Sequence, residues 1–120
     1  MMCTNGYLKL VDMGTAKKLK IERRYTTTTI IGTPHYIAPE IITGKGYSFH
    51  VDLWSLGVIM YELLCGKLPF GEYSDDPFTI YEEIINSSIK YPRNCQKNCK
   101  VFIEKLLSRS PHHRMGNGYE

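Results

Sequence analysis

Residues 51–64 limit most strongly what this chain can fold into. Written as a helix, this stretch has apolar side chains around its whole circumference, and Gly66 follows it as a C-terminal stop. Ser48 is the expected N-cap. A helix that is apolar on every side is buried on every side, so other elements must surround it. We therefore expect a mainly α fold with a central buried helix.

Two further helices are expected towards the C-terminus. Asp76-Pro77 starts the first, with apolar residues at helical spacing and Pro at the first position. Residues 87–97 are expected to form a linker. Residues 99–107 then form an amphipathic helix with its charged residues on the exposed side.

A remnant β-hairpin is expected at the N-terminus. Asn5-Gly6 favours a type I′ turn, and the alternating apolar residues of the stretch 7–11 predict a strand with one buried face. Only residues 1–3 are left to form the partner strand. The first strand of the hairpin is therefore expected to be incomplete.

Composition excludes several classes of protein. With 42% apolar and 22% charged residues, the chain is close to an average soluble domain. Its longest apolar-rich run, residues 53–64, contains Ser55 and Glu62 and is too short to span a bilayer. The formal charge of +3 is too small to indicate nucleic-acid binding or a polybasic membrane patch. We expect an intracellular, cytoplasmic protein.

The cysteines give no sign of a disulfide framework or a metal site. They are scattered at positions 3, 65, 95 and 99, so free thiols are expected. Cys95 and Cys99 could form a zinc site with His112 and His113. That interpretation is disfavoured, because adjacent histidines do not easily turn to one ion and the spacing fits no common zinc pattern.

Two motifs carry the functional signal. Residues 32–40 read Gly-Thr-Pro-His-Tyr-Ile-Ala-Pro-Glu, and seven of these nine positions match the pattern G-T-P-x-Y-x-A-P-E. That pattern closes the activation loop of eukaryotic protein kinases. Twenty residues earlier, Asp12-Met13-Gly14 follows the expected strand and resembles the kinase D-F-G.

The chain thus resembles the larger, C-terminal lobe of eukaryotic Ser/Thr protein kinases. Within that family it is most similar to the cGMP-dependent protein kinases of single-celled eukaryotes. The resemblance implies a partial kinase domain over residues 1–120, with an activation segment at 12–40 and a helical C-lobe at 41–120. The small ATP-binding lobe and the catalytic loop are absent from this sequence, so the catalytic-loop Asp is expected before residue 1.

The resemblance assigns roles to residues of the activation segment. Asp12 would hold Mg²⁺ on the ATP phosphates, and Met13 replaces the usual Phe, so it would specify the local geometry less tightly. Thr29 stands at the common activating phosphosite. Thr27 and Thr28 remain alternatives, because the register of an inserted loop cannot be read from the sequence.

Further roles concern peptide binding and support. The residues implied to contact a substrate are Ile30, Pro34, Ile37 and Glu62. The first three would line the pocket for the residue after the phosphoacceptor. Glu62 would hold an upstream Arg or Lys, or it is simply a structural polar residue.

Four residues are implied to hold the site together. Thr33 would support the catalytic loop, with which its hydroxyl bonds in the family. Asp52 would accept hydrogen bonds from the same loop, or it is an ordinary first-turn Asp favoured by the helix dipole. Glu40 is expected to pair with Arg114, and such buried pairs are often bidentate.

The implied reaction is transfer of the γ-phosphoryl group of ATP, with Mg²⁺, to Ser or Thr in basic peptides. The parent protein would be regulated by cGMP, with cAMP as the alternative. The isolated chain is expected to be inactive and to fold poorly without the missing N-terminal half of the kinase. A non-catalytic module that keeps the peptide-docking face and binds substrates or partners is the alternative function. A partial sequence of an active kinase is the simplest account of the missing parts.

Overall fold

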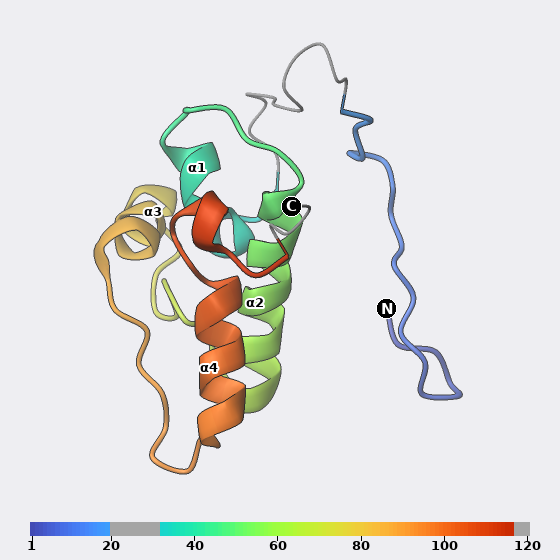
Figure 1. Cartoon of the computed structure of the whole chain (residues 1–120), viewed down its shortest axis with the longest axis vertical. Helices are drawn as coiled ribbons and strands as arrows, with labels where there is room; N and C mark the ends of the chain where they lie inside the picture. Colours follow the sequence, from blue (N-terminus) through green and yellow to red (C-terminus); the bar gives the residue numbers. More distant parts are fainter. Residues whose placement is uncertain (20–31, 117–120) are drawn as a thin grey trace.

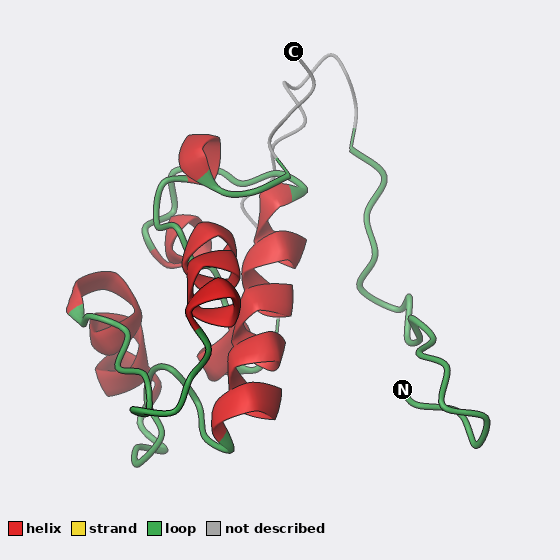
Figure 2. Cartoon of the chain, turned by 60° about the horizontal axis from the view of Figure 1, so that its bottom comes forward, coloured by secondary structure: helices red, strands yellow, loops and turns green. Residues whose placement is uncertain are grey.

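The fold is known from a computed structural model that describes residues 1–19 and 32–116. Figure 1 shows a body of packed helices and an N-terminal segment, coloured blue, that runs apart from it. No regular strand occurs within the described ranges (Figure 2). The expected mainly α architecture is confirmed. Its elements are η2 (Pro34–Tyr36), α1 (Pro39–Ile42), α2 (His50–Cys65), α3 (Pro77–Asn86), α4 (Lys97–Leu106) and η3 (Pro111–His113).

The remnant hairpin is present, but its turn differs from the expected type. The Cys3 amide donates to the Tyr7 carbonyl at 2.8 Å, and the Gly6 amide donates to the Cys3 carbonyl at 2.9 Å. Gly6 has a φ of +83°, whereas Asn5 does not have positive φ. This is a three-residue loop with one left-handed glycine, so the prediction of a type I′ turn was wrong. Met2 and Leu8 form a single antiparallel bridge.

The central helix α2 has about the expected length, but its N-cap residue was predicted incorrectly. Its C-terminus ends at Gly66, which has a φ of +69° and donates its amide to the Glu62 carbonyl at 2.8 Å. Phe49 stands at the N-cap position, and no side chain caps this end. Ser48 contributes its carbonyl to the first turn, accepting from the Val51 amide at 3.3 Å, so it is not the cap that the sequence predicted.

The core forms where α4 packs along one side of α2. Trp54, Val58 and Tyr61 of α2 are buried with Ile103 of α4 and the following Leu107. The two helices approach closely at Gly57. A Cβ atom added there would lie 2.8 Å from Leu107 Cδ2, so this position has no space for a side chain.

Burial of α2 on every side, as the sequence predicted, is wrong for this structure. Leu56, Ile59 and Leu63 are 44%, 43% and 78% exposed. They share one face, at spacings of three and four residues. Within the described ranges, no element covers that face, because α4 and η2 pack against other sides of the helix.

The two C-terminal helices agree with expectation apart from one boundary. Asp76 caps α3 by accepting from the Thr79 amide at 2.8 Å and the Thr79 hydroxyl at 2.7 Å. These bonds from Thr79 lower the pKa of the Asp76 carboxyl, because they stabilise its charged form. Helix α4 begins at Lys97, two residues earlier than predicted. No helix in the described part of the chain has the length and apolarity needed to cross a membrane.

Candidate functional site

The site is built on a buried ion pair between Glu40 in α1 and Arg114 after η3. Arg114 Nη1 lies 2.6 Å from Glu40 Oε1, and Nη2 lies 2.9 Å from Oε2, which makes the pair bidentate. Arg114 also donates to the Ser108 carbonyl at 3.0 Å and the His50 carbonyl at 2.7 Å. Its guanidinium lies 5.3 Å from the Trp54 ring centroid. The pair therefore joins α1, the start of α2 and the segment that follows α4.

The segment around η2 is bound to α2 by polar side chains. Ser55 Oγ donates to the Tyr36 carbonyl at 2.9 Å, and the Tyr36 hydroxyl donates to Glu62 Oε2 at 2.8 Å. On the other side, His35 Nε2 is 3.2 Å from the Gly71 carbonyl. The backbone of residues 34–36 is thus held at both flanks.

Glu62 and Tyr36 form an acid–phenol pair near one end of this segment. Burial raises the pKa of the Tyr36 hydroxyl, and the hydrogen bond and charge of Glu62 raise it further. The phenol therefore stays a donor. A carboxylate can accept several hydrogen bonds, so Glu62 retains capacity for a cationic ligand. The hydrogen bond from Tyr36 gives Glu62 a structural role. Its contact with a substrate stays a prediction.

The other predicted peptide contacts are not brought together on one open surface. Pro34 is half-buried at the start of η2, and Ile30 lies outside the described residues. Ile37 is only 4% exposed and belongs to the core cluster. The Ile37 side chain therefore packs in the core and does not line the substrate pocket that the motif had suggested.

Thr33 and Asp52 are both exposed. Thr33 precedes η2, and its carbonyl accepts from the Tyr36 amide at 3.1 Å without a side-chain cap. Asp52 lies in the first turn of α2. The three threonines predicted as phosphosites, at positions 27, 28 and 29, lie outside the described residues.

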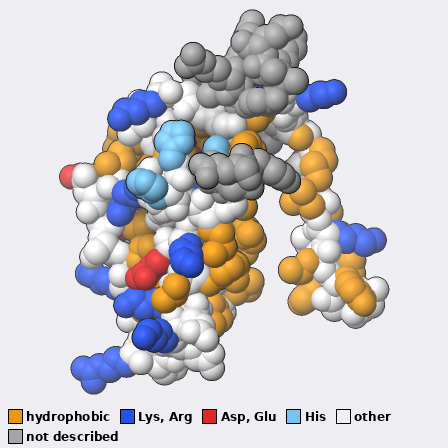
Figure 3. Space-filling model, in the orientation of Figure 1, with side chains coloured by type: hydrophobic (Ala, Val, Ile, Leu, Met, Phe, Trp, Pro, Cys, Tyr) orange, Lys and Arg blue, Asp and Glu red, His pale blue; other side chains and the backbone are white. Residues whose placement is uncertain are grey.

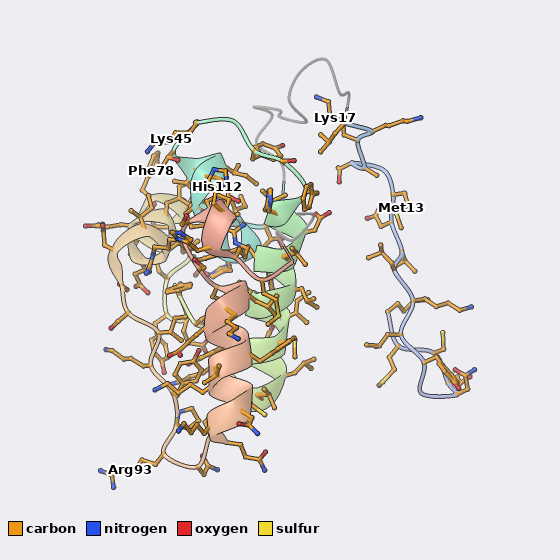
Figure 4. All side chains as sticks on the ribbon, in the orientation of Figure 1. Met13, Lys17, Lys45, Phe78, Arg93 and His112 are labelled. Carbon is orange, nitrogen blue, oxygen red and sulfur yellow. The ribbon has the colours of Figure 1, made fainter. Side chains whose placement is uncertain are left out.

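Asp12 stands apart from the rest of the candidate site. It has a φ of +63°, is exposed, and accepts from the Gly14 amide at 3.4 Å. Met13 is 55% exposed, and Figure 4 shows it on the segment that runs beside the helical body. The structure does not bring Asp12 together with Thr33 or Glu62.

Sequence reasoning missed Tyr36, Ser55 and His35, which bind η2 to its surroundings. Tyr36 occupies a specified position of the G-T-P-x-Y pattern, and Ser55 stands in the segment Asp52-Leu53-Trp54-Ser55 that opens the helix. Both residues thus stand in motif segments, which was the one signal that could have singled them out.

Two other possible sites contribute nothing to this arrangement. A cavity of about 540 Å³ lies between the end of α2, loop 67–73 and the end of α3, and its lining includes two Lys and two Glu side chains. In residues 1–19 and 32–116 no group of three or more possible metal ligands occurs. Cys95, Cys99, His112 and His113 are thus not gathered into one group in the described residues, and the four cysteines are free thiols.

Comparisons with known proteins all indicate one family. The protein kinase domain family matches residues 1–118. The chain is 43% identical over 119 residues to the cGMP-dependent protein kinase of Plasmodium berghei (strain Anka), covering 96% of this chain and 13% of that protein. It is 41% identical over 121 residues to the cGMP-dependent protein kinase of Toxoplasma gondii, covering 98% and 12%.

A cAMP-dependent relative is similar to the same degree. The cAMP-dependent protein kinase catalytic subunit 3 of Drosophila melanogaster is 47% identical over 113 residues, covering 94% of this chain and 18% of that protein. The chain spans less than a fifth of the length of these relatives. The match over residues 1–118 and the helical architecture agree, and we conclude that this chain belongs to the protein kinase domain family.

Proposed function

We propose that this chain is the activation segment and helical lobe of a Ser/Thr protein kinase that phosphorylates basic peptides. One observation carries the proposal. The bonds of Tyr36 to Glu62 and Ser55 hold η2 on α2, with the Glu62 carboxylate at its flank, and the Glu40–Arg114 pair anchors the helix α1 that follows. A fixed segment beside an acidic group suits a dock for a cationic peptide, because positioning and electrostatics supply most of the catalysis in phosphoryl transfer.

Asp12 is the residue proposed to hold Mg²⁺. Its carboxylate is exposed and, among residues 1–19 and 32–116, accepts a hydrogen bond only from the Gly14 amide at 3.4 Å, so oxygen atoms of the kind that Mg²⁺ prefers are available. When bound with ATP, the ion would neutralise charge on the phosphates. Thr33 is proposed to support the catalytic loop, and Asp52 to accept hydrogen bonds from it. Pro34, with Ile30, is proposed to contact the substrate, whereas Ile37 supports this segment from the core.

A chimera tests this function. Residues 1–118 would replace the matching segment of the Toxoplasma gondii kinase, and phosphate transfer from ATP to a Ser peptide with upstream Arg would be measured. We expect activity, loss of it in Asp12→Ala, and a raised KM for the basic peptide in Glu62→Gln. If the Glu62→Gln chimera keeps the parental KM, Glu62 has only its structural role. A folded chimera that binds ATP without transferring phosphate would contradict the function.

The isolated chain is proposed to be inactive, because the catalytic loop and the ATP-binding residues of the family are not among its 120 residues. Incubating the purified chain with ATP and the same peptide tests this. ATP-dependent phosphorylation that Asp12→Ala abolishes would overturn the proposal.

The parent protein is proposed to be regulated by cGMP. Relatives named as cGMP-dependent kinases support this, although a cAMP-dependent relative is equally similar. Kinase activity collected from cytoplasmic extract with an antibody against this chain should rise at a lower concentration of cGMP than of cAMP. The reverse order would assign the parent to the cAMP-dependent group.

Thr29 is the proposed activating phosphosite, and Thr27 and Thr28 are its rivals. A phosphate would add nearly two negative charges to a segment rich in Lys and Arg. In the chimera, Thr29→Ala should lower kcat, while Thr27→Ala and Thr28→Ala leave it near the parental value. Phosphopeptide mass spectrometry of the active chimera would identify the modified residue directly.

A non-catalytic docking module is the second candidate. It is favoured by the fact that the ion pair and the core are built within residues 34–114 of this chain. A soluble monomer with one sharp thermal transition, binding a basic peptide without ATP, would support it. A folded chain that does not bind the basic peptide, or one that aggregates, would argue against this candidate.

A further inference from the structure

The small net charge of this chain conceals two regions of opposite charge. Residues 71–83 contain five acidic residues and no Lys or Arg. Residues 90–105 contain five Lys or Arg and one acidic residue. The formal charge of +3 averages over these regions, so it does not describe either surface. The basic face, as we define it, consists of Lys90, Arg93, Lys97, Lys100 and Lys105, all of them exposed.

Helix α4 holds three of these residues at the surface. Residues 97, 100, 101, 104 and 105 lie on one side of the helix, since they are separated by three or four positions. The opposite side is anchored in the core through Ile103 and Leu106. Lys100 Nζ lies 4.0 Å from Glu104 Oε1 and 5.2 Å from the centroid of the Tyr91 ring. Figure 3 shows Lys and Arg groups spread over this part of the surface with one acidic group among them.

The loop before α4 extends the basic face outwards. Arg93 lies in a turn in which the Cys95 amide donates to the Pro92 carbonyl at 3.0 Å. Figure 4 shows its side chain at the far end of the molecule, pointing away from the helices. Val101, 41% exposed, provides apolar surface among the lysines of α4. The face therefore combines spread-out positive charge with an exposed apolar side chain.

The composition of the face indicates its partner. Four of its five cations are Lys, whose ammonium is a point charge, whereas Arg is the residue suited to bidentate recognition of one carboxylate or phosphate. The charges spread over a helix side and a loop and do not converge on one group. Such a surface fits many mobile anions in a plane better than one defined ligand.

We propose that the basic face docks this chain on the anionic surface of a membrane, with Arg93 and the lysines of α4 towards the lipid headgroups. The interaction is peripheral. It requires no membrane-spanning helix, and it is independent of the function proposed above, because the residues of the basic face take no part in the candidate site.

Vesicle binding of the full 120-residue chain tests this. The chain should sediment with vesicles containing about one-third phosphatidylserine and remain free with phosphatidylcholine alone, and binding should weaken at about 0.5 M salt. Each Lys or Arg near an anionic surface contributes about fivefold to partitioning, so K97Q/K100Q/K105Q should lower it about a hundredfold.

The matched control is K9Q/K18Q/K45Q, which changes the net charge equally at three other exposed lysines. It should stay within about threefold of the parent chain, since these side chains lie outside the basic face. An equal loss in both triple variants would show attraction by net charge alone and would overturn the proposal. Binding to polyglutamate with none to vesicles would assign the face to an acidic protein, which also overturns it.

Hydrogen exchange on the bound chain provides a second measurement that needs no variant. Vesicles should slow exchange of the amides in residues 90–96 and leave residues 71–76 unchanged. Slowed exchange at residues 71–76 instead would place the contact on the acidic region and contradict the proposal.

Discussion

The N-terminal segment and the helical body each carry a kinase motif, and among the described residues only the body gives the acidic residue of its motif a distant side-chain partner. In the body, Glu40 is 7% exposed and holds two hydrogen bonds to Arg114. In the segment, Asp12 is exposed, and Leu8 and Leu10 are 78% and 87% exposed. A motif residue therefore has a defined geometry only where the same chain supplies its partner.

The cause of this difference is the cost of burial. A carboxylate in the body must be paired, because a buried charge without a partner is strongly unfavourable. A carboxylate in water has no such requirement and can turn freely. Substitutions in the two regions should consequently have very different effects on stability, and the following predictions test that contrast.

The largest effect is expected for Arg114→Ala. This change leaves Glu40 as an unpaired buried charge, which costs about 3 to 5 kcal/mol of unfolding free energy. Asp12→Ala should change it by less than about 0.5 kcal/mol, because Asp12 is exposed. Urea unfolding followed by the fluorescence of Trp54, the one tryptophan in the chain, measures both.

A double variant controls for the loss of packing. Replacing Glu40 by Met together with Arg114 by Leu removes both charges, so it should cost much less than Arg114→Ala alone. Equal losses from Arg114→Ala and Asp12→Ala would show that the two motifs are supported alike, and the contrast would be wrong.

The second prediction concerns the contact of α2 with α4. Gly57→Ala places a methyl group 2.8 Å from Leu107 Cδ2 and 2.9 Å from Leu106 Cβ, which should cost about 1 to 3 kcal/mol. Gly6→Ala strains a left-handed turn in the hairpin, where a Cβ would meet nothing within 4 Å. It should leave the urea midpoint of the body unchanged. If Gly57→Ala stabilised the chain, α2 and α4 would be able to move apart with little loss of free energy.

The elements of the fold were predictable from local sequence features. Gly66 and Asp76-Pro77 mark helix ends through backbone geometry that needs no distant partner. The Glu40–Arg114 contact was expected from the motifs, and the structure contains it. The helix-end signals are sufficient because each depends on few residues, whereas the Glu40–Arg114 contact joins residues 74 positions apart and was expected only from the resemblance to protein kinases.

The remaining features depend on neighbours that residue spacing does not specify. The apolar pattern of α2 does not state which sides are covered, so the exposure of Leu63 was missed. Ile37 was assigned to a peptide pocket by its place in a motif, but it lies in the core. The basic face on α4 was missed because net charge carries no information about position.

The third prediction uses the buried tyrosines of the body. Burial, with smaller contributions from Cys65, raises the pKa of Tyr61 to about 12, and burial also raises the pKa of Tyr91. Because these folded-state values exceed the unfolded value of about 10, this stability is complete below pH 10 and is lost as pH rises towards 12. Urea unfolding at several pH values should show that fall.

Variants of two tyrosines separate the regions. Tyr61→Phe should reduce the fall above pH 10 and, by removing the hydrogen bond to the Lys90 carbonyl, cost about 1 kcal/mol at neutral pH. Tyr7→Phe, in the hairpin and 73% exposed, should leave the curve unchanged. Identical curves for the two variants would mean that the buried phenol of Tyr61 is not coupled to folding.

The smallest effect is expected for Leu10→Ala in the N-terminal segment. Its side chain is 87% exposed, so truncation removes almost no packing and should change the unfolding free energy by less than about 0.5 kcal/mol. Ile84→Ala is the matched truncation in the body, where the side chain is fully buried, and should cost about 2 to 5 kcal/mol. Urea unfolding of both variants gives the difference directly. If Leu10→Ala costs as much as Ile84→Ala, the segment packs on the body in solution, and Asp12 is then held by the same chain after all.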